Sequence, residues 1–487
     1  MRRNETNTKH GRRKVSRTVT VVCGALAAAL VALIAFMTLS GEDLLLVATN
    51  SVSRSLCTSA FVSGVDPARV FKEEQLPTMR SLGWALRIHV DPAKREVHTS
   101  VLGAFGARAV YREGLGCVLV HGDVNVPEAV GIKADASTAA SDEPALVETT
   151  NSAIKRALDL AFSEPDAKAR RLTKAIVVLH DGKLIAERYA DGYGPQTPIW
   201  GHSLSKSITN ALIGILVRQG KLRVDEPAPI AAWSSPGDPR HAITIDQLLR
   251  MDSGLPFDET DGPLNPMSRM FFLHNDMASY ATTVPLAHPP GVAWSYSNLG
   301  YVLLSRIAMN AAGADTAAAS ERFMREQLFA PLGMHHTIME TDLAGTPIGS
   351  SHVYASARDF ARFGQLYLDD GVANGQRVLP EGWAAYSHSQ TLNTGYGAGF
   401  WTNLVNEGSV PVWDASWGMP QLPKDMFYAR GALGQYIVIV PSEQLVVVRL
   451  GITTDGSTGI GDAVASIIAA IHPTSANASM ALRGAER

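Results

Sequence analysis

The chain has 487 residues, with 43 Lys and Arg against 46 Asp and Glu, 46 % hydrophobic residues and three cysteines. Its length accommodates two to four domains of about 100–200 residues each, and its hydrophobic share excludes a disordered or collagen-like chain. Three cysteines exclude a disulfide-rich miniprotein and a four-thiolate zinc site.

The net charge of −3 averages two unlike parts of the chain. Residues 1–17 contain seven basic residues and one acidic residue, whereas the remainder contains 36 basic and 45 acidic residues, a net charge of −9. A nucleic-acid-binding protein places positive charge on its folded body. We therefore expect no nucleic-acid partner.

An uncharged, mostly apolar stretch, residues 18–41, follows the basic tail. A helix of about 20 apolar residues spans a bilayer, whereas the apolar region of a cleaved signal peptide has only about 7–15 residues. We predict a basic cytoplasmic tail over 1–17 and a transmembrane signal anchor over 18–41, with a cleaved signal as the alternative. The positive-inside rule then places the rest of the chain outside the inner (cytoplasmic) membrane, on the periplasmic side.

Two cysteines, Cys57 and Cys117, fall on the exported side of this predicted topology. Disulfides persist in oxidising compartments, so the two residues are candidates for a disulfide. Two buried free thiols are the equal alternative, because the sequence does not give the distance between them.

Residues 42–125 are predicted to form a small segment of mixed structure. Alternating apolar residues predict a hairpin of Trp84–Val90 with Glu96–Val101, and a second strand pair within Ala107–His121. Residues 126–143 are rich in Ala, Ser, Asp and Pro and have no periodicity, which is typical of a linker.

The large domain is predicted to span residues 144–473, with a flexible tail over 474–487. Strands are expected near both of its ends, in hairpins of Lys174–His180 with Lys183–Tyr189 and of Tyr436–Val440 with Leu445–Leu450. Helices are expected at Val147–Phe162, Asp246–Met251, Leu299–Ala312, Thr316–Leu328, Ala357–Leu368 and Ile460–Ile471. This order favours an α+β fold, in which an antiparallel sheet carries an inserted all-helical lobe.

A candidate nucleophile lies in residues 201–210, GHSLSKSITN. Apolar residues spaced along the following stretch predict a helix whose first turn contains Ser203 and Lys206. Residues three apart share a helix face, so the lysine amine can reach the serine hydroxyl and act as its base. The alternatives are a helix cap without chemistry and a G-x-S-x-G nucleophile elbow, whose last glycine is replaced by Ser205.

A second motif, Tyr296-Ser297-Asn298, precedes a predicted apolar helix. A tyrosine there can carry a proton between a nucleophile and a leaving group, and an asparagine can hydrogen-bond a substrate amide. The alternative for Tyr296 is an ordinary core tyrosine.

Ser203-x-x-Lys206 followed by Tyr296-x-Asn298 resembles the serine β-lactamase and penicillin-binding-protein superfamily, in its class C, esterase and D-aminopeptidase branch. The stretches LLRMDSGL, PLGM, ASARDFARFGQLYLDDG and GYGAGFW agree, in the order of the family. The run FYARGALGQYIVIVP most resembles the 6-aminohexanoate-dimer hydrolase-like subgroup. The resemblance covers about residues 174–472 and implies a β-lactamase/transpeptidase-like fold, with helices flanking the antiparallel sheet.

The resemblance also implies roles for individual residues. Ser203 would form an acyl-enzyme, and Lys206 and Tyr296 would act as its general base and acid. Asn298 would position the substrate and Lys206. The backbone N–H groups of Ser203 and Ala432 would form the oxyanion hole.

One motif departs from the family. Where the family has Lys-Thr-Gly or His-x-Gly, this chain has Ala429-Arg430-Gly431. Gly431 is interpreted as letting the backbone approach the substrate, and Arg430 as a candidate replacement for the missing cation. Because consecutive side chains of a strand point to opposite faces, that replacement is a poor one. The departure favours an ester or short amide over a β-lactam as substrate.

Two tryptophans and a possible metal site remain to be considered. Trp413 and Trp417 form an apolar rim, or they belong to ordinary loop packing. The pair His335-His336, even with Glu340 nearby, lacks the ligand spacing of a zinc site, so we expect no metal and no cofactor.

The sequence therefore predicts a membrane-anchored, exported serine hydrolase that acts on a small molecule or short peptide and contacts the lipid bilayer through residues 18–41. One alternative is a β-lactamase or D-Ala-type peptidase acting on cell-wall peptides. The other is a catalytically inactive binding protein of the same fold. Nothing in the sequence determines the oligomeric state.

Overall fold

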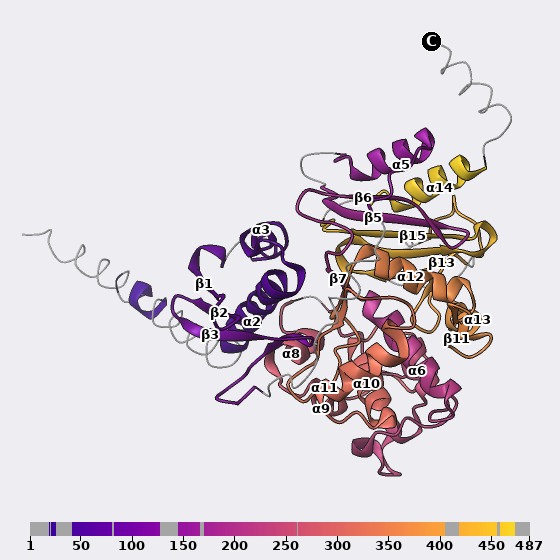
Figure 1. Ribbon diagram of the computed structural model, residues 1–487. Helices are drawn as coiled ribbons and strands as arrows, with labels where there is room; N and C mark the ends of the chain where they lie inside the picture. Colours follow the sequence, from indigo (N-terminus) through magenta and orange to yellow (C-terminus); the bar gives the residue numbers. More distant parts are fainter. Residues whose placement is uncertain are drawn as a thin grey trace, which may run out of the picture.

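The computed structural model describes residues 19, 21–25, 41–79, 82–126, 145–165, 170–260, 262–404, 418–454 and 458–472. Along these stretches, no helix combines the length and the apolar character needed to cross a membrane. Most of the predicted anchor (18–41) and linker (126–143), together with the tails 1–17 and 474–487, lies outside the described residues. Figure 1 shows an N-terminal lobe, residues 41–126, beside a larger main body, residues 145–472.

The N-terminal lobe is one long helix packed across a four-stranded antiparallel sheet of order β1-β2-β3-β4 (Figure 1). The helix is α2 (Glu42–Thr58), and the strands are β1 (Leu86–Asp91), β2 (Glu96–Val101), β3 (Ala104–Arg112) and β4 (Gly116–Leu119). Both predicted strand pairs are confirmed, although β1 starts later than predicted because Gly83–Ala85 form a 3₁₀ turn. The lobe also contains α3 (Pro67–Val70) and π-helical turns at Ser59–Ser63 and Phe71–Gln75.

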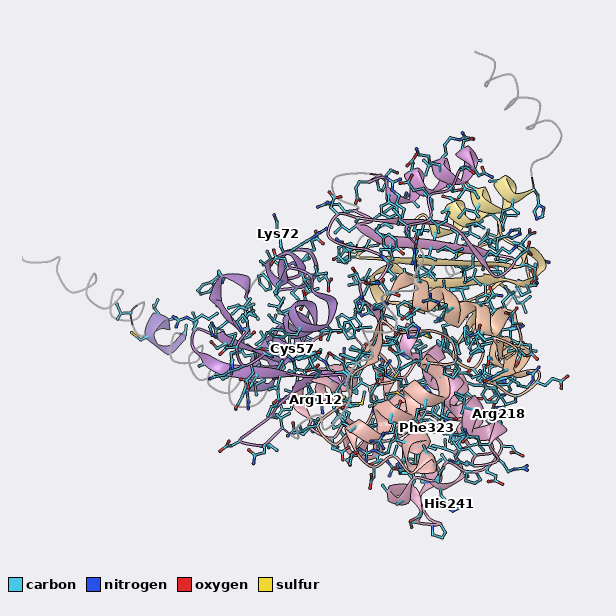
Figure 2. All side chains as sticks on the ribbon, in the orientation of Figure 1. Cys57, Lys72, Arg112, Arg218, His241 and Phe323 are labelled. Atoms are coloured by element: carbon cyan, nitrogen blue, oxygen red, sulfur yellow. A yellow bond between two sulfur atoms is a disulfide. The ribbon has the colours of Figure 1, made fainter. Side chains whose placement is uncertain are left out.

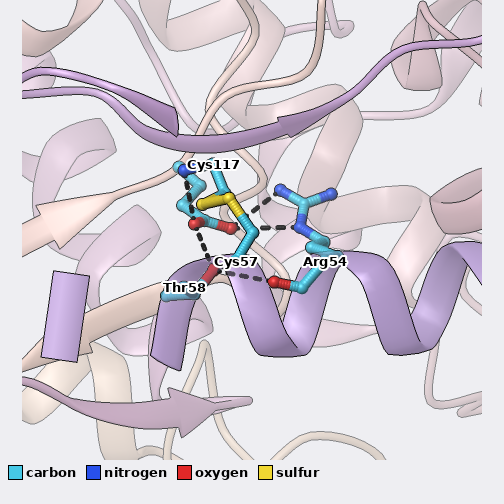
Figure 3. Close-up of a disulfide and its surroundings, with 5 residues drawn as sticks. Arg54, Cys57, Thr58 and Cys117 are labelled. Carbon is cyan, nitrogen blue, oxygen red and sulfur yellow. Dashed lines mark hydrogen bonds and ion pairs between the residues drawn. A yellow bond between two sulfur atoms is a disulfide. The ribbon is translucent and has the colours of Figure 1, made fainter. Parts of the chain in front are cut away.

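The disulfide alternative is correct: Cys57 of α2 is bonded to Cys117 of β4, with their Cα atoms 6.1 Å apart. Figure 3 shows this bond beside the side chains of Arg54 and Thr58, which come from the same helix. The bond ties the helix to the edge strand of the sheet on which it packs.

The main body is built on a six-stranded sheet of order β12-β13-β14-β15-β5-β6, in which every neighbouring pair is antiparallel. The strands are β5 (Thr173–His180), β6 (Lys183–Tyr189), β12 (Trp401–Thr402), β13 (Phe427–Gly431), β14 (Gln435–Val440) and β15 (Leu445–Gly451). Early and late segments meet at the β5–β15 pair, where Val177 lies opposite Val448. This confirms the predicted α+β arrangement of an antiparallel sheet made from both ends of the domain.

Helices cover both faces of this sheet (Figure 1). α5 (Ser152–Phe162) and α14 (Ile460–Ile471) pack together on one face, and α12 (Ala357–Leu368) packs on the other. The predicted start of the first helix at Val147 is wrong. The side chain of Asn151 accepts hydrogen bonds from the amides of Ala153 and Ile154, which caps the helix there.

A lobe of helices is inserted between the strands, as predicted. It contains α6 (Leu204–Arg218), α7 (Ile245–Arg250), α8 (Pro266–Leu273), α9 (Met277–Thr283), α10 (Asn298–Ala312) and α11 (Ala317–Met324), and α13 (Trp383–His388) follows α12. A π-helical turn over Arg325–Phe329 continues α11, and short 3₁₀ turns lie at Ala231–Trp233, Pro239–Ala242, Ala432–Gly434 and Pro441–Glu443.

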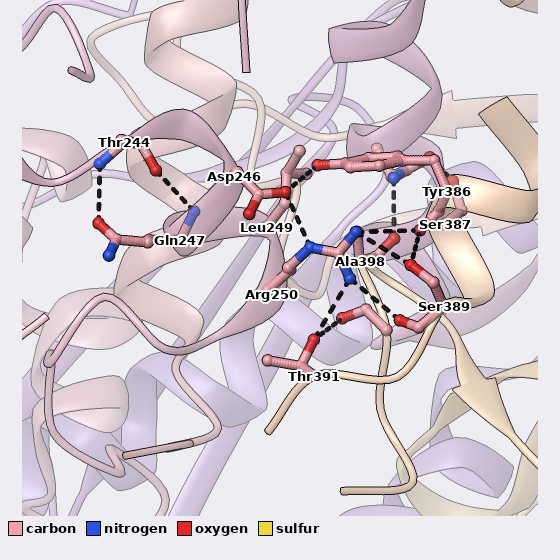
Figure 4. Close-up of polar contacts among 12 residues, drawn as sticks. Thr244, Asp246, Gln247, Leu249, Arg250, Tyr386, Ser387, Ser389, Thr391 and Ala398 are labelled. Carbon is pink, nitrogen blue, oxygen red and sulfur yellow. Dashed lines mark hydrogen bonds and ion pairs between the residues drawn. The ribbon is translucent and has the colours of Figure 1, made fainter. Parts of the chain in front are cut away.

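Helix α7 is fixed at both of its ends (Figure 4). Thr244 and Gln247 form a reciprocal capping box at its start. At its end, Arg250 donates hydrogen bonds to Asp246 and to the carbonyl oxygens of Tyr386 and Ser389. These bonds tie the helical lobe to the segment that follows α13.

A small sheet of order β7-β9-β8 leads to the contact between the main body and the N-terminal lobe. Its strands are β7 (Ile199–His202), β8 (Thr337–Met339) and β9 (Val353–Ala355), and a separate short hairpin is formed by β10 (Val372–Ala373) and β11 (Gln376–Arg377). Just after β8, the buried Glu340 carboxylate accepts hydrogen bonds from Arg54, Thr58 and the amide of Cys117 in the N-terminal lobe. Arg112, labelled in Figure 2, donates to Thr341 across the same interface.

Candidate active site

Ser203 lies at a sharp turn between strand and helix. Strand β7 ends at His202, whose φ of +49° lies in the left-handed region, and Ser203 is the N-cap of α6. A Cβ at Gly431 would lie 2.2 Å from the carbonyl oxygen of Gly201. The glycine of the third motif is therefore required by the close approach of β13 to the nucleophile strand, and not only by a substrate, as the sequence interpretation had it.

The Lys206 amine is buried behind Ser203, with 2 % of the residue exposed. Its Nζ lies 3.1 Å from Ser203 Oγ and donates to Asn298 Oδ1 at 2.7 Å and to the carbonyl oxygen of Ser350 at 2.8 Å. The i, i+3 spacing therefore brings the serine and lysine together as the sequence predicted.

Burial lowers the pKa of Lys206 to about 8, against the opposing influence of the Glu259 and Asp258 carboxylates. A desolvated amine prefers its neutral form, because the charged form loses the hydration that it has in water. An appreciable fraction of this lysine is consequently neutral near physiological pH and able to accept a proton.

Tyr296 closes the site on the other side of the lysine. Lys206 Nζ lies 4.6 Å from the centre of its ring, and the tyrosine hydroxyl is hydrogen-bonded with the side chain of Ser203. Burial and the Glu259 carboxylate raise the pKa of Tyr296 well above its ordinary value. The hydroxyl therefore stays protonated. Trp401 stacks on this ring at an interplanar angle of 20°.

Asn298 is the first residue of α10 and lies behind Lys206. While its oxygen accepts from Lys206, its nitrogen donates to Asp258 Oδ1 at 3.0 Å and to Glu259 Oε1 at 2.7 Å. Sequence reasoning missed both carboxylates. They precede Asn298 by about 40 residues, with no recognisable spacing, and only the fold brings them there.

The end of β13 borders the nucleophile through Gly431, and Ala432 is the next residue. Arg430 is half-buried, and its guanidinium carbon lies 5.9 Å from the centre of the Tyr436 ring on the neighbouring strand. Trp413 and Trp417 lie outside the described residues. No group of three or more His, Cys, Asp or Glu side chains within the described ranges is arranged to hold a metal ion.

The residues discussed for zinc are engaged elsewhere. Glu340, for example, contacts the N-terminal lobe. By contrast, Ser203, Lys206 and Tyr296 converge on one point, with an amide oxygen and a backbone carbonyl behind the lysine. Such a set can deprotonate a serine hydroxyl and return a proton to a leaving group.

A family model described as Beta-lactamase matches residues 158–465. The 6-aminohexanoate-dimer hydrolase of Paenarthrobacter ureafaciens is 24 % identical over 320 residues, covering 61 % of this chain and 78 % of that protein. Penicillin-binding protein 4 of Amycolatopsis lactamdurans is 27 % identical over 291 residues, covering 51 % and 70 %. The crystal structure of a family VIII carboxylesterase aligns with a TM-score of 0.51 and 14 % identity, over 66 % of this chain and 98 % of that one, and shows a shared fold.

Proposed function

The chain belongs to the beta-lactamase family, and we propose that it is a serine hydrolase that cleaves an ester or a short amide through an acyl intermediate on Ser203. One observation carries the proposal: the Ser203 hydroxyl is contacted by both a buried lysine amine and a tyrosine hydroxyl. This arrangement provides a base for the attack and an acid for the leaving group.

In the acylation step, neutral Lys206 takes the proton of Ser203 while Oγ forms a bond to the substrate carbonyl carbon. Collapse of the tetrahedral intermediate breaks the bond to the leaving group, which receives a proton from Tyr296. The tyrosine is replenished by Lys206, so the net transfer is one proton from Ser203 to the leaving group. Water then attacks the acyl carbon and its proton passes through the Tyr296 hydroxyl to neutral Lys206. As the second intermediate collapses, that proton returns to Ser203 Oγ and the acid is released.

The oxyanion of the tetrahedral intermediate would accept hydrogen bonds from the backbone N–H groups of Ser203 and Ala432. Ser203 lies at the N-terminus of α6, and Ala432 follows the β13 residue that packs against β7. One such donor contributes about 3–4 kcal/mol to stabilising a transition state.

The substrate class is proposed from the third motif. Ala429 is fully buried in β13 and supplies no cation for the carboxylate of a β-lactam or a peptide. The likeness to an aminohexanoate-dimer hydrolase supports an amide or ester without that carboxylate. The likeness to a penicillin-binding protein favours the second candidate, cleavage of cell-wall peptides or β-lactams.

We also propose that residues 18–41 anchor the protein in the inner membrane, with the main body outside the cytoplasm. The uncharged run after a basic tail supports this, and so does the Cys57–Cys117 disulfide, because disulfides persist in oxidising compartments. Protease added to spheroplasts is expected to digest the body without detergent. Protection until the membrane is dissolved would contradict the topology.

The test of the reaction is labelling by a fluorophosphonate probe. Wild-type protein is expected to be labelled and Ser203→Ala is not. Ser279→Ala removes an exposed serine from the first turn of another helix, α9, and serves as the matched control. Labelling of Ser203→Ala at the wild-type rate would refute the proposal. A panel of esters, short amides, aminohexanoate dimers and a chromogenic cephalosporin then separates the two substrate classes.

A further inference from the structure

The amide of Asn298 is held between a cation and two carboxylates, and its orientation decides which atom meets the lysine. We infer that Asp258 and Glu259 are positioning residues, which fix the Asn298 side chain so that its oxygen faces Lys206. This inference rests on the proposed function, because it concerns the base of that reaction. It adds two residues to the site that no motif identified.

Asp258 is the inner of the two carboxylates and is fully buried. Its Oδ2 accepts from the amide of Leu299 at 2.9 Å and from Ser297 Oγ at 3.3 Å, while its Oδ1 accepts from Asn298 Nδ2. All three contacts come from donors at the start of α10, so Asp258 acts as an acceptor on both oxygens. It holds the backbone and the side chain of this helix start at once.

Glu259 is half-buried and provides the second acceptor for the same nitrogen, at 2.7 Å. An amide nitrogen has two N–H donors, and here each has its own carboxylate. If the amide were turned over, its oxygen would face two carboxylates and its N–H groups would face the lysine. That arrangement would replace three hydrogen bonds by contacts between like partners, so the flipped state is excluded.

The orientation of Asn298 has a direct consequence for the base. A neutral lysine amine has two N–H groups and one lone pair. Asn298 Oδ1 and the carbonyl oxygen of Ser350 can only accept, so they take the two N–H groups. The lone pair is then left for Ser203 Oγ, the third neighbour, at 3.1 Å. The two carboxylates thus orient the lone pair of Lys206 Nζ toward Ser203 Oγ, although neither carboxylate contacts the serine.

The charges around the lysine amine are few. Asp258 and Glu259 are its carboxyl neighbours, and the Tyr296 and Tyr301 rings lie 4.6 and 5.8 Å from Nζ. Burial raises the pKa of Asp258 to about 7, so its charge acts on the lysine in the pH range above that value. Burial lowers the pKa of His202 to about 3 and that of His352 well below its ordinary value, so both histidines are neutral. Removing either carboxylate charge therefore favours the neutral lysine and shifts its titration to lower pH.

The test measures the second-order rate of fluorophosphonate labelling against pH in the full-length protein. Asp258→Asn and Glu259→Gln keep the shape of each side chain. We expect each to slow labelling roughly 10- to 100-fold, which is less than the loss of a whole general base, about 10²–10⁴-fold. We also expect the rise of rate with pH to move to lower pH in both variants.

Asp342→Asn is the matched control. Asp342 is another buried carboxylate that accepts two backbone amides, those of Met277 and Thr346, but it lies away from Lys206. This variant shows how the loss of a buried carboxylate charge far from the lysine affects thermal stability and the labelling rate. Thermal unfolding of all three variants shows whether they are folded, and Glu259→Gln, which changes a half-buried side chain, keeps the test informative if Asp258→Asn does not fold.

The outcomes are distinct. If wild-type protein is not labelled, the proposed function fails. If the wild type is labelled, two outcomes overturn the positioning role. In the first, both variants react at the wild-type rate. In the second, their labelling rates fall no more than that of Asp342→Asn and their pH profiles are unchanged.

Discussion

Two buried cations of this protein, Lys206 in the candidate active site and Arg54 at the lobe interface, are each 2 % exposed. Lys206 faces neutral acceptors, namely an amide oxygen, a carbonyl and a hydroxyl. Arg54 faces the Glu340 carboxylate directly, with their side chains 3 % and 0 % exposed. The lysine amine can lose its proton, whereas a guanidinium keeps its charge in proteins and is here paired with a carboxylate.

The difference lies in the distance of the compensating charge. Around Lys206 the carboxylates of Asp258 and Glu259 stand one residue further away, behind Asn298. Around Arg54 the carboxylate is in contact. A buried cation in direct contact with an anion is structural, and one separated from it by a neutral amide remains reactive.

The largest expected effect comes from replacing the reactive cation. Lys206→Met removes the base, so turnover and fluorophosphonate labelling should fall by about 10²–10⁴-fold. The free energy of unfolding should change little, because the gain from removing a buried amine opposes the loss of a donor for Asn298 Oδ1 and the Ser350 carbonyl. Chemical denaturation beside the rate measurement checks both. If Lys206→Met were strongly destabilised but still labelled at Ser203, Lys206 would be a structural cation like Arg54.

Arg54→Ala should do the opposite. Leaving Glu340 buried without its ion-pair partner costs about 3–5 kcal/mol in the free energy of unfolding, while Ser203 labelling of the folded protein persists. The double variant Arg54→Met/Glu340→Met should recover part of this loss, because neither member of the ion pair is then left buried alone. Thr58 and the amide of Cys117 still lose their acceptor. Denaturant titrations measure both variants. A double variant no more stable than Arg54→Ala would refute this account.

Removing the disulfide sharpens the comparison, because it loosens the N-terminal lobe on one side of that interface without changing any charge. Cys57→Ser/Cys117→Ser should lower the free energy of unfolding by about 2–5 kcal/mol, because the chain loses a cross-link that closes a loop of 60 residues. Cys23→Ser is the control, since Cys23 is free. Equal stability of the two variants would show that the bond does not form in the mature protein.

The smallest effect is a pH dependence. Folding lowers the pKa of Lys206 to about 8 because the amine is buried, and the base must be neutral to act. The acylation rate should therefore rise with pH through about 8 and fall about tenfold per unit below it. The pKa of Tyr296 is raised by burial, so its loss of a proton should not limit the rate in this range. A flat profile between pH 6 and 9 would contradict this role.

The sequence predicted what is local. The spacing of Ser203 and Lys206 on one helix turn, and the strands of the hairpins on both sides of the domain, depend on residues close to one another. Helix α12 begins and ends at the predicted residues, Ala357 and Leu368, because Ser356 caps it. Chain-local chemistry is sufficient for such features.

The helix of the N-terminal lobe was missed although it has a signal. Ala48, Val52 and Leu56 recur at every fourth position and form the buried face of α2. The adjoining uncharged run of residues 18–41 predicts a transmembrane helix, and the helix that follows it was not distinguished from that run. Asp258 and Glu259 could not have been found this way, since a carboxylate in a loop acquires its role only when the fold brings Asn298 to it.

The main sheet joins strands from the two ends of its domain, with β5 paired to β15 inside it. Such long-range pairing gives the domain a high contact order, so the sheet completes only after the C-terminal strands have been synthesised, and folding is slow. Gly431, against which the nucleophile turn is packed, belongs to those late strands. A chain interrupted during synthesis would therefore carry Ser203 in an unformed turn, and the proposed activity would arise only in finished molecules.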